Sequence, residues 1–142
     1  MKRLIWLVLF IVPTVSLADQ WLCVADQATG FLYNESSKKW KQTEFTVDDS
    51  KYIVAPNKGN KDYKYSVTKI GAKGPEAQCE LGFNDFGFLF CSMDSQFKMN
   101  KDNGRFIRIY DHGYFNVLPD VNSITDENSS TPLIEIGKCS KF

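Results

Sequence analysis

The sequence predicts an all-β protein, either a small antiparallel barrel or a two-sheet sandwich of about eight strands that disulfides hold together. Short apolar or alternating runs are separated by turn residues roughly every 8–12 residues. Helical periodicity is poor throughout, and the 142-residue chain carries four cysteines, an even number. A barrel of eight strands would have an interior that side chains fill or that holds one small ligand.

The predicted strands follow one another with polar or glycine-containing turns between them. Alternation places Tyr65 and Val67 on one face of their strand. Phe86, Phe88 and Phe90 share a strand face, which predicts that most of them lie in the core and that any exposed remainder is a partner surface. The best candidate for a single helical turn is 76–81. The strands are predicted over residues 21–25, 31–33, 40–47, 52–55 and 63–70, in a hairpin over 79–91, and over 96–99, 105–110, 114–117 and 133–136.

Residues 1–18 have the order of a secretory signal peptide, which is a charged start, an apolar run and a small-residue cleavage site. The apolar run of residues 4–12 is shorter than the roughly 20 residues that a spanning helix needs. Leu22 before Cys23 is not the small residue that lipid attachment requires. We therefore expect residues 19–142 to form a single β domain that is exported to the periplasm or secreted, without an integral membrane anchor. Loss of Lys2 and Arg3 would change its net charge from 0 to −2.

The four cysteines predict two disulfides, because an even set in a small exported chain is usually oxidised. Four cysteines allow three connectivities, and the sequence alone leaves them open. We favour Cys79–Cys91 with Cys23–Cys139, since a hairpin that turns over residues 84–87 would place Cys79 opposite Cys91. The second bridge would then join the first strand to the last. The absence of any C-x-x-C pair argues against a thioredoxin-like role and against a zinc site.

Charge and composition narrow the range of functions. A formal net charge of 0 argues against nucleic-acid binding, and a single histidine leaves little scope for metal chemistry. Two acidic pairs, Asp48-Asp49 and Asp126-Glu127, could bind calcium or act as a glycosidase pair. We interpret both pairs as solvated turns, because no D-x-D-x-D-G loop is present. The sequence therefore predicts no metal, no cofactor and no catalytic residue.

Five residues are candidates for a binding patch. Arg108, Tyr110, His112 and Tyr114 bring a cation, an imidazole and two phenols together within seven residues, a combination found in recognition surfaces. The alternative, which we favour, is a turn that joins two strands, with both tyrosines packed inward or across the hairpin. Trp40 could stack on a sugar or a cation, or could face inward from a strand. No G-x-S-x-G motif supports a catalytic triad at His112.

Several sequence blocks resemble a group of small, secreted, uncharacterised proteins of Gram-negative bacteria. The blocks are residues 23–31 (CVADQATGF), 97–100 (FKMN), 104–107 (GRFI), 113–114 (GY) and 131–139 (TPLIEIGKC). The resemblance implies a periplasmic location and no established activity, and it transfers no functional residue. Size and strand number are also similar to those of the periplasmic inhibitors of lysozyme. The Ser-Gly and tyrosine motif of those inhibitors is absent here, so this second likeness concerns architecture alone.

These observations favour a non-enzymatic binding module whose partner is an unknown protein or small ligand. The alternative is an inhibitor of a cell-wall hydrolase such as lysozyme, and the least favoured function is a hydrolase. A protruding loop with an exposed aromatic would favour the inhibitor. A dry cavity lined by Phe and Tyr would favour a small-ligand binder, and perturbed acids around a cleft would favour an enzyme.

Overall fold

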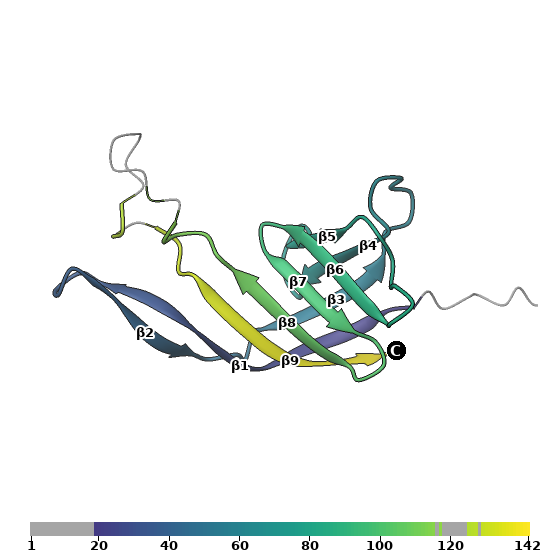
Figure 1. Ribbon diagram of the computed structural model, residues 1–142, viewed down its shortest axis with the longest axis horizontal. Helices are drawn as coiled ribbons and strands as arrows, with labels where there is room; N and C mark the ends of the chain where they lie inside the picture. The colour runs from purple at the N-terminus through teal and green to yellow at the C-terminus, as the bar shows by residue number, and fades with distance from the viewer. Residues whose placement is uncertain (1–18, 116, 118–124, 128) are drawn as a thin grey trace, which may run out of the picture.

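The computed structural model describes residues 19–115, 117, 125–127 and 129–142, and the predicted signal peptide lies outside them. The described residues form nine strands and no helix (Figure 1). The strands are β1 (Trp21–Asn34), β2 (Lys39–Phe45), β3 (Lys51–Pro56), β4 (Tyr65–Lys69), β5 (Ala77–Cys79), β6 (Phe88–Met93), β7 (Gln96–Asn100), β8 (Arg105–Tyr110) and β9 (Leu133–Lys141).

All nine strands belong to one antiparallel sheet in the order β2-β1-β3-β4-β5-β6-β7-β8-β9, and an additional pairing of β1 with β9 closes it. Eight strands therefore form a closed barrel, and β2 is an extra strand attached to β1. Of the two predicted architectures, the barrel is the one that forms. Closure gives the strands of the barrel hydrogen-bonding partners on both sides, which removes exposed edges.

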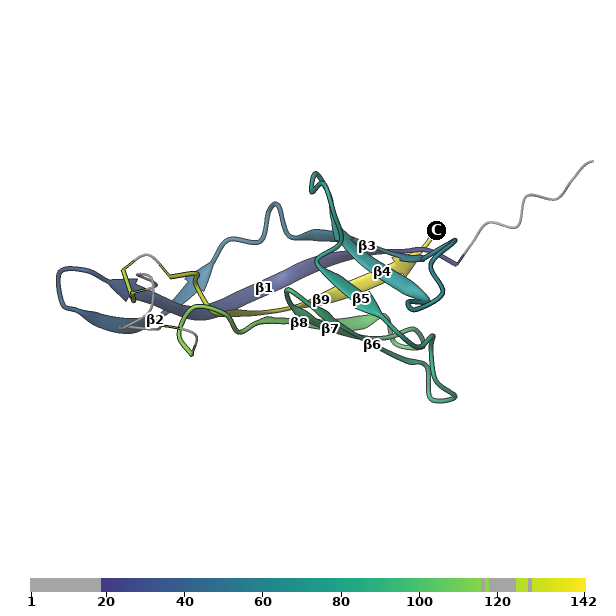
Figure 2. The same cartoon turned by 90° about the horizontal axis from the view of Figure 1, so that it is seen from above.

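Strand β1 is longer than the sequence predicts, because it joins the stretches predicted over residues 21–25 and 31–33. Its first part pairs with β3, its second part pairs with β2, and β9 runs along both. A bulge between Ala25 and Gln27 shifts the register with β9. Gly30 does not interrupt the strand. A glycine is required at this position because a Cβ would lie only 2.1 Å from the Pro132 carbonyl oxygen of the neighbouring chain segment. The β1–β2 hairpin consequently projects beyond the barrel (Figures 1 and 2).

Large side chains fill the barrel interior. Tyr52, Leu89, Phe97 and Met99 are almost fully buried. The rings of Phe97 and Phe106 stack with their centroids 5.1 Å apart, and Tyr52 lies 6.0 Å from each of them. Aromatic pairs at such separations are favourable beyond the area they bury. At this level of the barrel, side chains therefore fill the interior, which is one of the two kinds of interior that the sequence predicts.

Both disulfides have the connectivity that the sequence favours. Cys79–Cys91 links β5 to β6, and its two cysteines are 12 residues apart in the sequence. Cys23–Cys139 links β1 to β9, and its two cysteines are 116 residues apart. Cys23 lies directly opposite Cys139 in the register, so the second bridge joins the first and last strands where the barrel closes. Disulfides are consistent with an exported or oxidising compartment.

The predicted helical turn over residues 76–81 is wrong, because Ala77–Cys79 is strand β5. The core placement of the phenylalanines is also wrong. Phe86, Phe88 and Phe90 are 76%, 41% and 57% exposed. Side chains alternate along a strand, and Cys91 must face inward to reach Cys79, so its neighbour Phe90 faces outward.

The turn predicted in the 79–91 hairpin is present. The Asn84 side-chain oxygen accepts hydrogen bonds from the backbone N–H groups of Phe86 and Phe88, and Gly87 has a φ of 76°. The strand predicted over residues 114–117 is wrong for Tyr114 and Phe115. These two residues lie in a turn after β8, and residue 116 is outside the described part of the chain.

Candidate functional site

The outer face of β1, β8 and β9 carries large apolar side chains where barrel strands usually carry polar ones. Ile134 and Ile136 are 42% and 46% exposed, whereas Glu135 between them is 4% exposed. In the register Ile134 is paired with Ile109 of β8 and with Thr29 of β1. Paired residues project from the same face of a sheet, so these side chains form one surface outside the barrel.

A groove with a volume of about 600 Å³ lies on this surface, and we call it the apolar groove. Strands β1, β8 and β9 contribute one set of lining residues, and the turn after β8 contributes another. Phe31, Tyr114 and Phe115 are 51%, 64% and 66% exposed, which leaves their rings accessible. The lining consists of Thr29, Gly30, Phe31, Gln42, Ile109, Tyr110, Asp111, Tyr114, Phe115, Pro132, Leu133 and Ile134.

Ring contacts connect the turn after β8 to strand β2. Trp40 lies 5.6 Å from the ring of Tyr114 and 5.6 Å from that of Tyr33, both in edge-on arrangements. The indole N–H of Trp40 donates a 2.9 Å hydrogen bond to Asp126, which fixes the orientation of the ring. Trp40 is therefore a half-buried residue of the β1–β2 hairpin and not an inward-facing residue of the barrel.

His112 contacts two of the aromatic residues that line the groove. Its ring is 5.3 Å from that of Tyr110 and 5.9 Å from that of Phe115. The sequence favours a turn that joins two strands at this stretch, with both tyrosines packed inward or across the hairpin. The turn is present, but Tyr114 faces the groove and does not pack inward.

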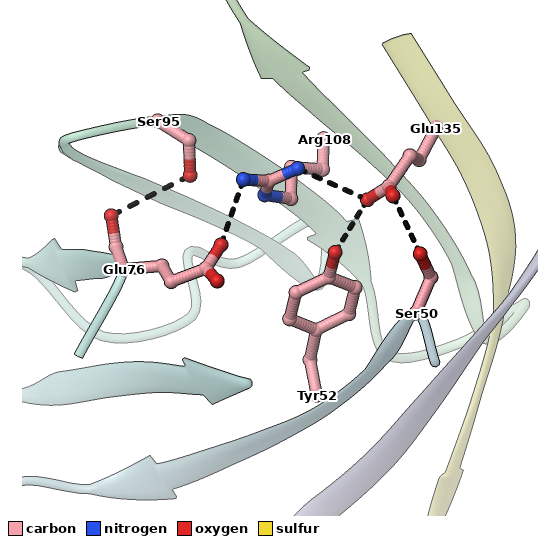
Figure 3. Close-up of polar contacts among 6 residues, drawn as sticks. All are labelled: Ser50, Tyr52, Glu76, Ser95, Arg108 and Glu135. Atoms are coloured by element: carbon pink, nitrogen blue, oxygen red, sulfur yellow. Dashed lines mark hydrogen bonds and ion pairs between the residues drawn. The ribbon is translucent and has the colours of Figure 1, made fainter. Parts of the chain in front are cut away.

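Arg108, the fifth predicted residue, lies on the opposite face, inside the barrel. Its guanidinium pairs with Glu135 at 3.2 Å and with Glu76 at 2.7 Å (Figure 3). Its side chain is 11% exposed and that of Glu135 is 5% exposed. Arg108 also lies 5.5 Å from the centre of the Tyr52 ring. Its role is to neutralise two acids in the interior, and it does not reach the groove.

Two hydroxyl groups complete the pairing of Glu135. Ser50 donates a 2.7 Å hydrogen bond to one carboxylate oxygen, and Tyr52 donates a 2.5 Å hydrogen bond to the other (Figure 3). Both oxygens of this buried carboxylate therefore have donors, as burial of a charge requires. The arrangement stabilises an ionised carboxylate and directs its oxygens at the protein's own donors.

Burial raises the pKa of the Tyr52 hydroxyl well above its usual value, and the hydrogen bond to Glu135 raises it further. In the unfolded chain a tyrosine loses its proton at a pH of about 10. Above that pH the unfolded chain binds fewer protons than the folded chain, so the free energy of unfolding falls as pH rises.

We expect this fall to approach at most ~1.4 kcal/mol per pH unit for Tyr52. A Tyr52→Phe variant should be less stable at neutral pH but should show a shallower decline above pH ~10. Urea denaturation of both proteins across this range measures the difference. Parallel declines would mean that Tyr52 does not carry the alkaline pH dependence.

The acidic pairs take part in local contacts. Asp126 accepts the hydrogen bond of Trp40, and Glu127 pairs with Lys38 of the β1–β2 turn. Asp48 and Asp49 are exposed beside β3. Among the residues that the structure describes, no group of three or more His, Cys, Asp or Glu side chains could hold a metal ion.

Four of the five predicted residues, all except Arg108, gather at or beside the groove. Sequence reasoning missed Phe31, Ile109 and Ile134, which supply much of the apolar lining. A signal existed for Ile134 alone, in the run Leu133 to Ile136, where one glutamate alternates with isoleucines. Alternation identifies two faces, but it does not say which face is inside.

The fold and this site together define a disulfide-linked antiparallel barrel with an apolar groove on its outer face. No family model matches this chain, and no curated protein or solved structure matches it either. The resemblance to secreted proteins of Gram-negative bacteria therefore stays a prediction. The described residues include no helix that is long and apolar enough to span a membrane.

Proposed function

We propose that the protein is an exported, non-enzymatic binding module that holds an apolar segment of a partner in the apolar groove. The supporting observation is the groove itself, where Phe31, Tyr114 and Phe115 are each more than half exposed around a volume of about 600 Å³. Concave apolar surfaces with accessible aromatic rings are typical of recognition sites. The signal-peptide pattern and the two disulfides favour the periplasm or the outside of the cell.

The chemistry at the groove favours binding over catalysis. Asp111 is the acid in its lining, and the two tyrosines there are the other titratable groups. The buried acid of the barrel, Glu135, is already held by three donors. A hydrolase would need an acid or a nucleophile positioned beside a bound substrate. The groove offers apolar contact area instead.

An inhibitor of a cell-wall hydrolase is the second candidate, and one loop favours it. Leu81 and Phe86 are each 76% exposed on the segment between Cys79 and Cys91. The disulfide and the hydrogen bonds to the Asn84 side chain restrain this segment. A rigid loop with exposed apolar side chains is suited to enter a cleft, because little conformational entropy is lost on binding. Inhibition of lysozyme that Phe86→Ser abolishes would support this second function.

Capture of a partner by the mature protein tests the primary proposal. We expect a Phe31→Ser/Ile134→Ser variant to lose the partner that the wild-type protein retains from a periplasmic or culture extract, scored by mass spectrometry. Both substitutions replace partly exposed groove residues, so the fold should persist. Phe90→Ser is the matched control, since Phe90 is 57% exposed and lies outside the groove.

The two variants separate the possible outcomes. Loss of the partner with the groove variant and retention with Phe90→Ser would support the proposal. Equal retention by both variants would place binding elsewhere on the protein and contradict it. Circular dichroism and urea denaturation of each variant establish that the comparison is made between folded proteins.

A further inference from the structure

We infer that the ligand of the apolar groove is a peptide segment that carries basic side chains at both ends of a short apolar stretch. This inference rests on the proposed function and specifies the ligand of the same site. It follows from the charges around the groove, from their positions in the strand register and from the continuity of the groove with a second hollow.

The apolar groove continues along the outer face of the sheet. A second hollow of about 530 Å³ shares Thr29, Gln42 and Ile134 with it. The second hollow extends the surface past Ile136 and toward the bulge in β1. The two hollows therefore form one elongated surface, of the kind that an extended chain can follow and a compact small molecule would only partly fill.

Among the described residues that line the two hollows, the fully charged side chains are acids. Asp111 lines the first hollow, and Asp26 and Glu44 line the second. All three are exposed side chains. No Lys, Arg or His from the described part of the chain lines either hollow. A ligand with apolar side chains and positive charge would match both the apolar contact area and the charge.

The bases of the same outer face lie farther along it. Lys138 follows Ile136 on β9 and is paired with Arg105, and Lys98 is paired with Ile107. These positions lie beside the far end of the isoleucine surface but outside the lining of the two hollows. They would repel a base of the ligand placed at that end of the surface.

The register gives the spacing between the acids at the two sides. Across the sheet, Glu44 of β2 is paired with Thr29 of β1, Thr29 with Ile134 of β9, and Ile134 with Ile109 of β8. Glu44 therefore lies three strands away from Ile109. At a strand spacing of about 4.8 Å this is roughly 14 Å. Asp111 is two residues beyond Ile109, or about 7 Å along the chain. The two acids are therefore about 16 Å apart.

An extended peptide advances about 3.3 Å per residue, so five residues cover this distance. Side chains of an extended chain alternate between two faces, so both bases face the groove only when their positions differ by an even number. A ligand with a base, five intervening residues and a second base spans about 20 Å, and its flexible basic side chains can reach back to Asp111 and Glu44 together. Its intervening apolar side chains would lie over Ile134 and Phe31. Because β9 is paired on both edges, the ligand would be recognised through side chains and not by joining the sheet at β9.

Three synthetic peptides test the inference. Each carries the same short leucine-containing stretch, flanked by lysines in the first peptide, glutamines in the second and glutamates in the third. We expect the lysine peptide to bind about tenfold more tightly than the glutamine peptide by fluorescence anisotropy, because exposed ion pairs each contribute a few-fold at most. The difference should shrink at high salt. The glutamate peptide should bind most weakly.

Charge-neutralised proteins assign the effect to the groove. Asp111→Asn/Glu44→Gln should remove the preference for the lysine peptide while binding of the glutamine peptide persists. Asp48→Asn/Asp62→Asn is the matched control, because both of these acids are exposed and outside the groove, and it should retain the preference. An equal loss in both double variants would mean that the preference reflects overall charge, which would overturn the inference.

Failure of the inference is distinguishable from failure of the proposed function. If the glutamine and lysine peptides bind equally and Phe31→Ser/Ile134→Ser abolishes both, the groove is a binding site without charge selectivity. The inference is then wrong and the proposed function stands. If no peptide binds but the groove variant still loses a captured partner, the inference alone is again wrong. If no peptide binds and partner capture is independent of the groove, both are wrong.

Discussion

Arg108→Met should lower the free energy of unfolding by about 3–5 kcal/mol, the cost of leaving buried charges without their partner. Arg108 faces two acids, and its removal would leave Glu135, whose side chain is 5% exposed, with hydroxyl donors alone. Methionine fills a similar volume, so the change is mainly one of charge. Urea denaturation followed by near-ultraviolet circular dichroism gives the free energy and the midpoint.

Lys38→Met is the matched control for this prediction. Lys38 pairs with Glu127, but both side chains are about half exposed or more. Water screens an ion pair this exposed, so the control variant should remain close to the wild-type protein. A similar small loss for Arg108→Met would show that water reaches the interior pair, and the account of Arg108 as a buried counter-charge would then be wrong.

A second substitution distinguishes lost pairing from lost packing. In Arg108→Met the unpaired Glu135 carboxylate should be the main source of instability, so adding Glu135→Leu should restore part of the lost free energy. Glu76 is 22% exposed and can be solvated in the double variant. If the double variant were less stable than the single one by the full cost of a cavity, the lost stability would come mainly from packing and not from charge.

The sequence was sufficient for features that depend on local pattern. Alternation and turn residues indicated an all-β chain, and the spacing of Cys79 and Cys91 around a turn indicated their pairing. Joining the first strand to the last then followed by elimination, and Cys23 and Cys139 are indeed opposite each other in the register. The choice between barrel and sandwich was not accessible, because it depends on whether the last strand pairs with the first.

The candidate site was only partly predictable, because alternation does not identify the inner face. In β9 the usual expectation would place Ile134 and Ile136 inside and Glu135 outside. The structure has the reverse arrangement, since Arg108 on the neighbouring strand supplies a counter-charge within the barrel. Glu135 also shares its face of β9 with Cys139, which bonds to Cys23, so Ile134 and Ile136 face outward and create the groove surface.

The phenylalanines of β6 lie outside the core for a related reason. Phe88 and Phe90 have the hydrophobicity of core residues, but Leu89 and Cys91 take the inward positions. Because Cys91 must face inward to reach Cys79, it determines which residues of β6 face inward and which face outward. The two disulfides thus fix which residues of β6 and β9 face inward, Arg108 supplies the counter-charge for the buried Glu135, and both strands leave apolar side chains at the surface.

Replacing Cys23 and Cys139 together by alanine should lower the free energy of unfolding by about 5 kcal/mol. In the chain-entropy account a disulfide stabilises by restricting the unfolded chain, and its effect grows with the length of the loop it closes. Cys23–Cys139 closes 116 residues and Cys79–Cys91 closes 12, so the corresponding loss for the short bridge is about 3 kcal/mol. Losses of this size are a large part of a typical stability of roughly 5–15 kcal/mol.

Comparison of the two double-alanine variants isolates the effect of loop length, because Cys23, Cys79 and Cys91 are all buried and each variant loses a similar pair of sulfur atoms. The difference of about 2 kcal/mol is therefore a more reliable quantity than either loss alone. It is measured by urea denaturation of the oxidised proteins. Equal losses would mean that the length of the closed loop does not set the stabilisation, and the chain-entropy account of the bridge between β1 and β9 would be wrong. A larger difference in the expected direction would indicate that barrel closure is cooperative with this bridge, since Cys23 and Cys139 lie opposite each other where β1 pairs with β9.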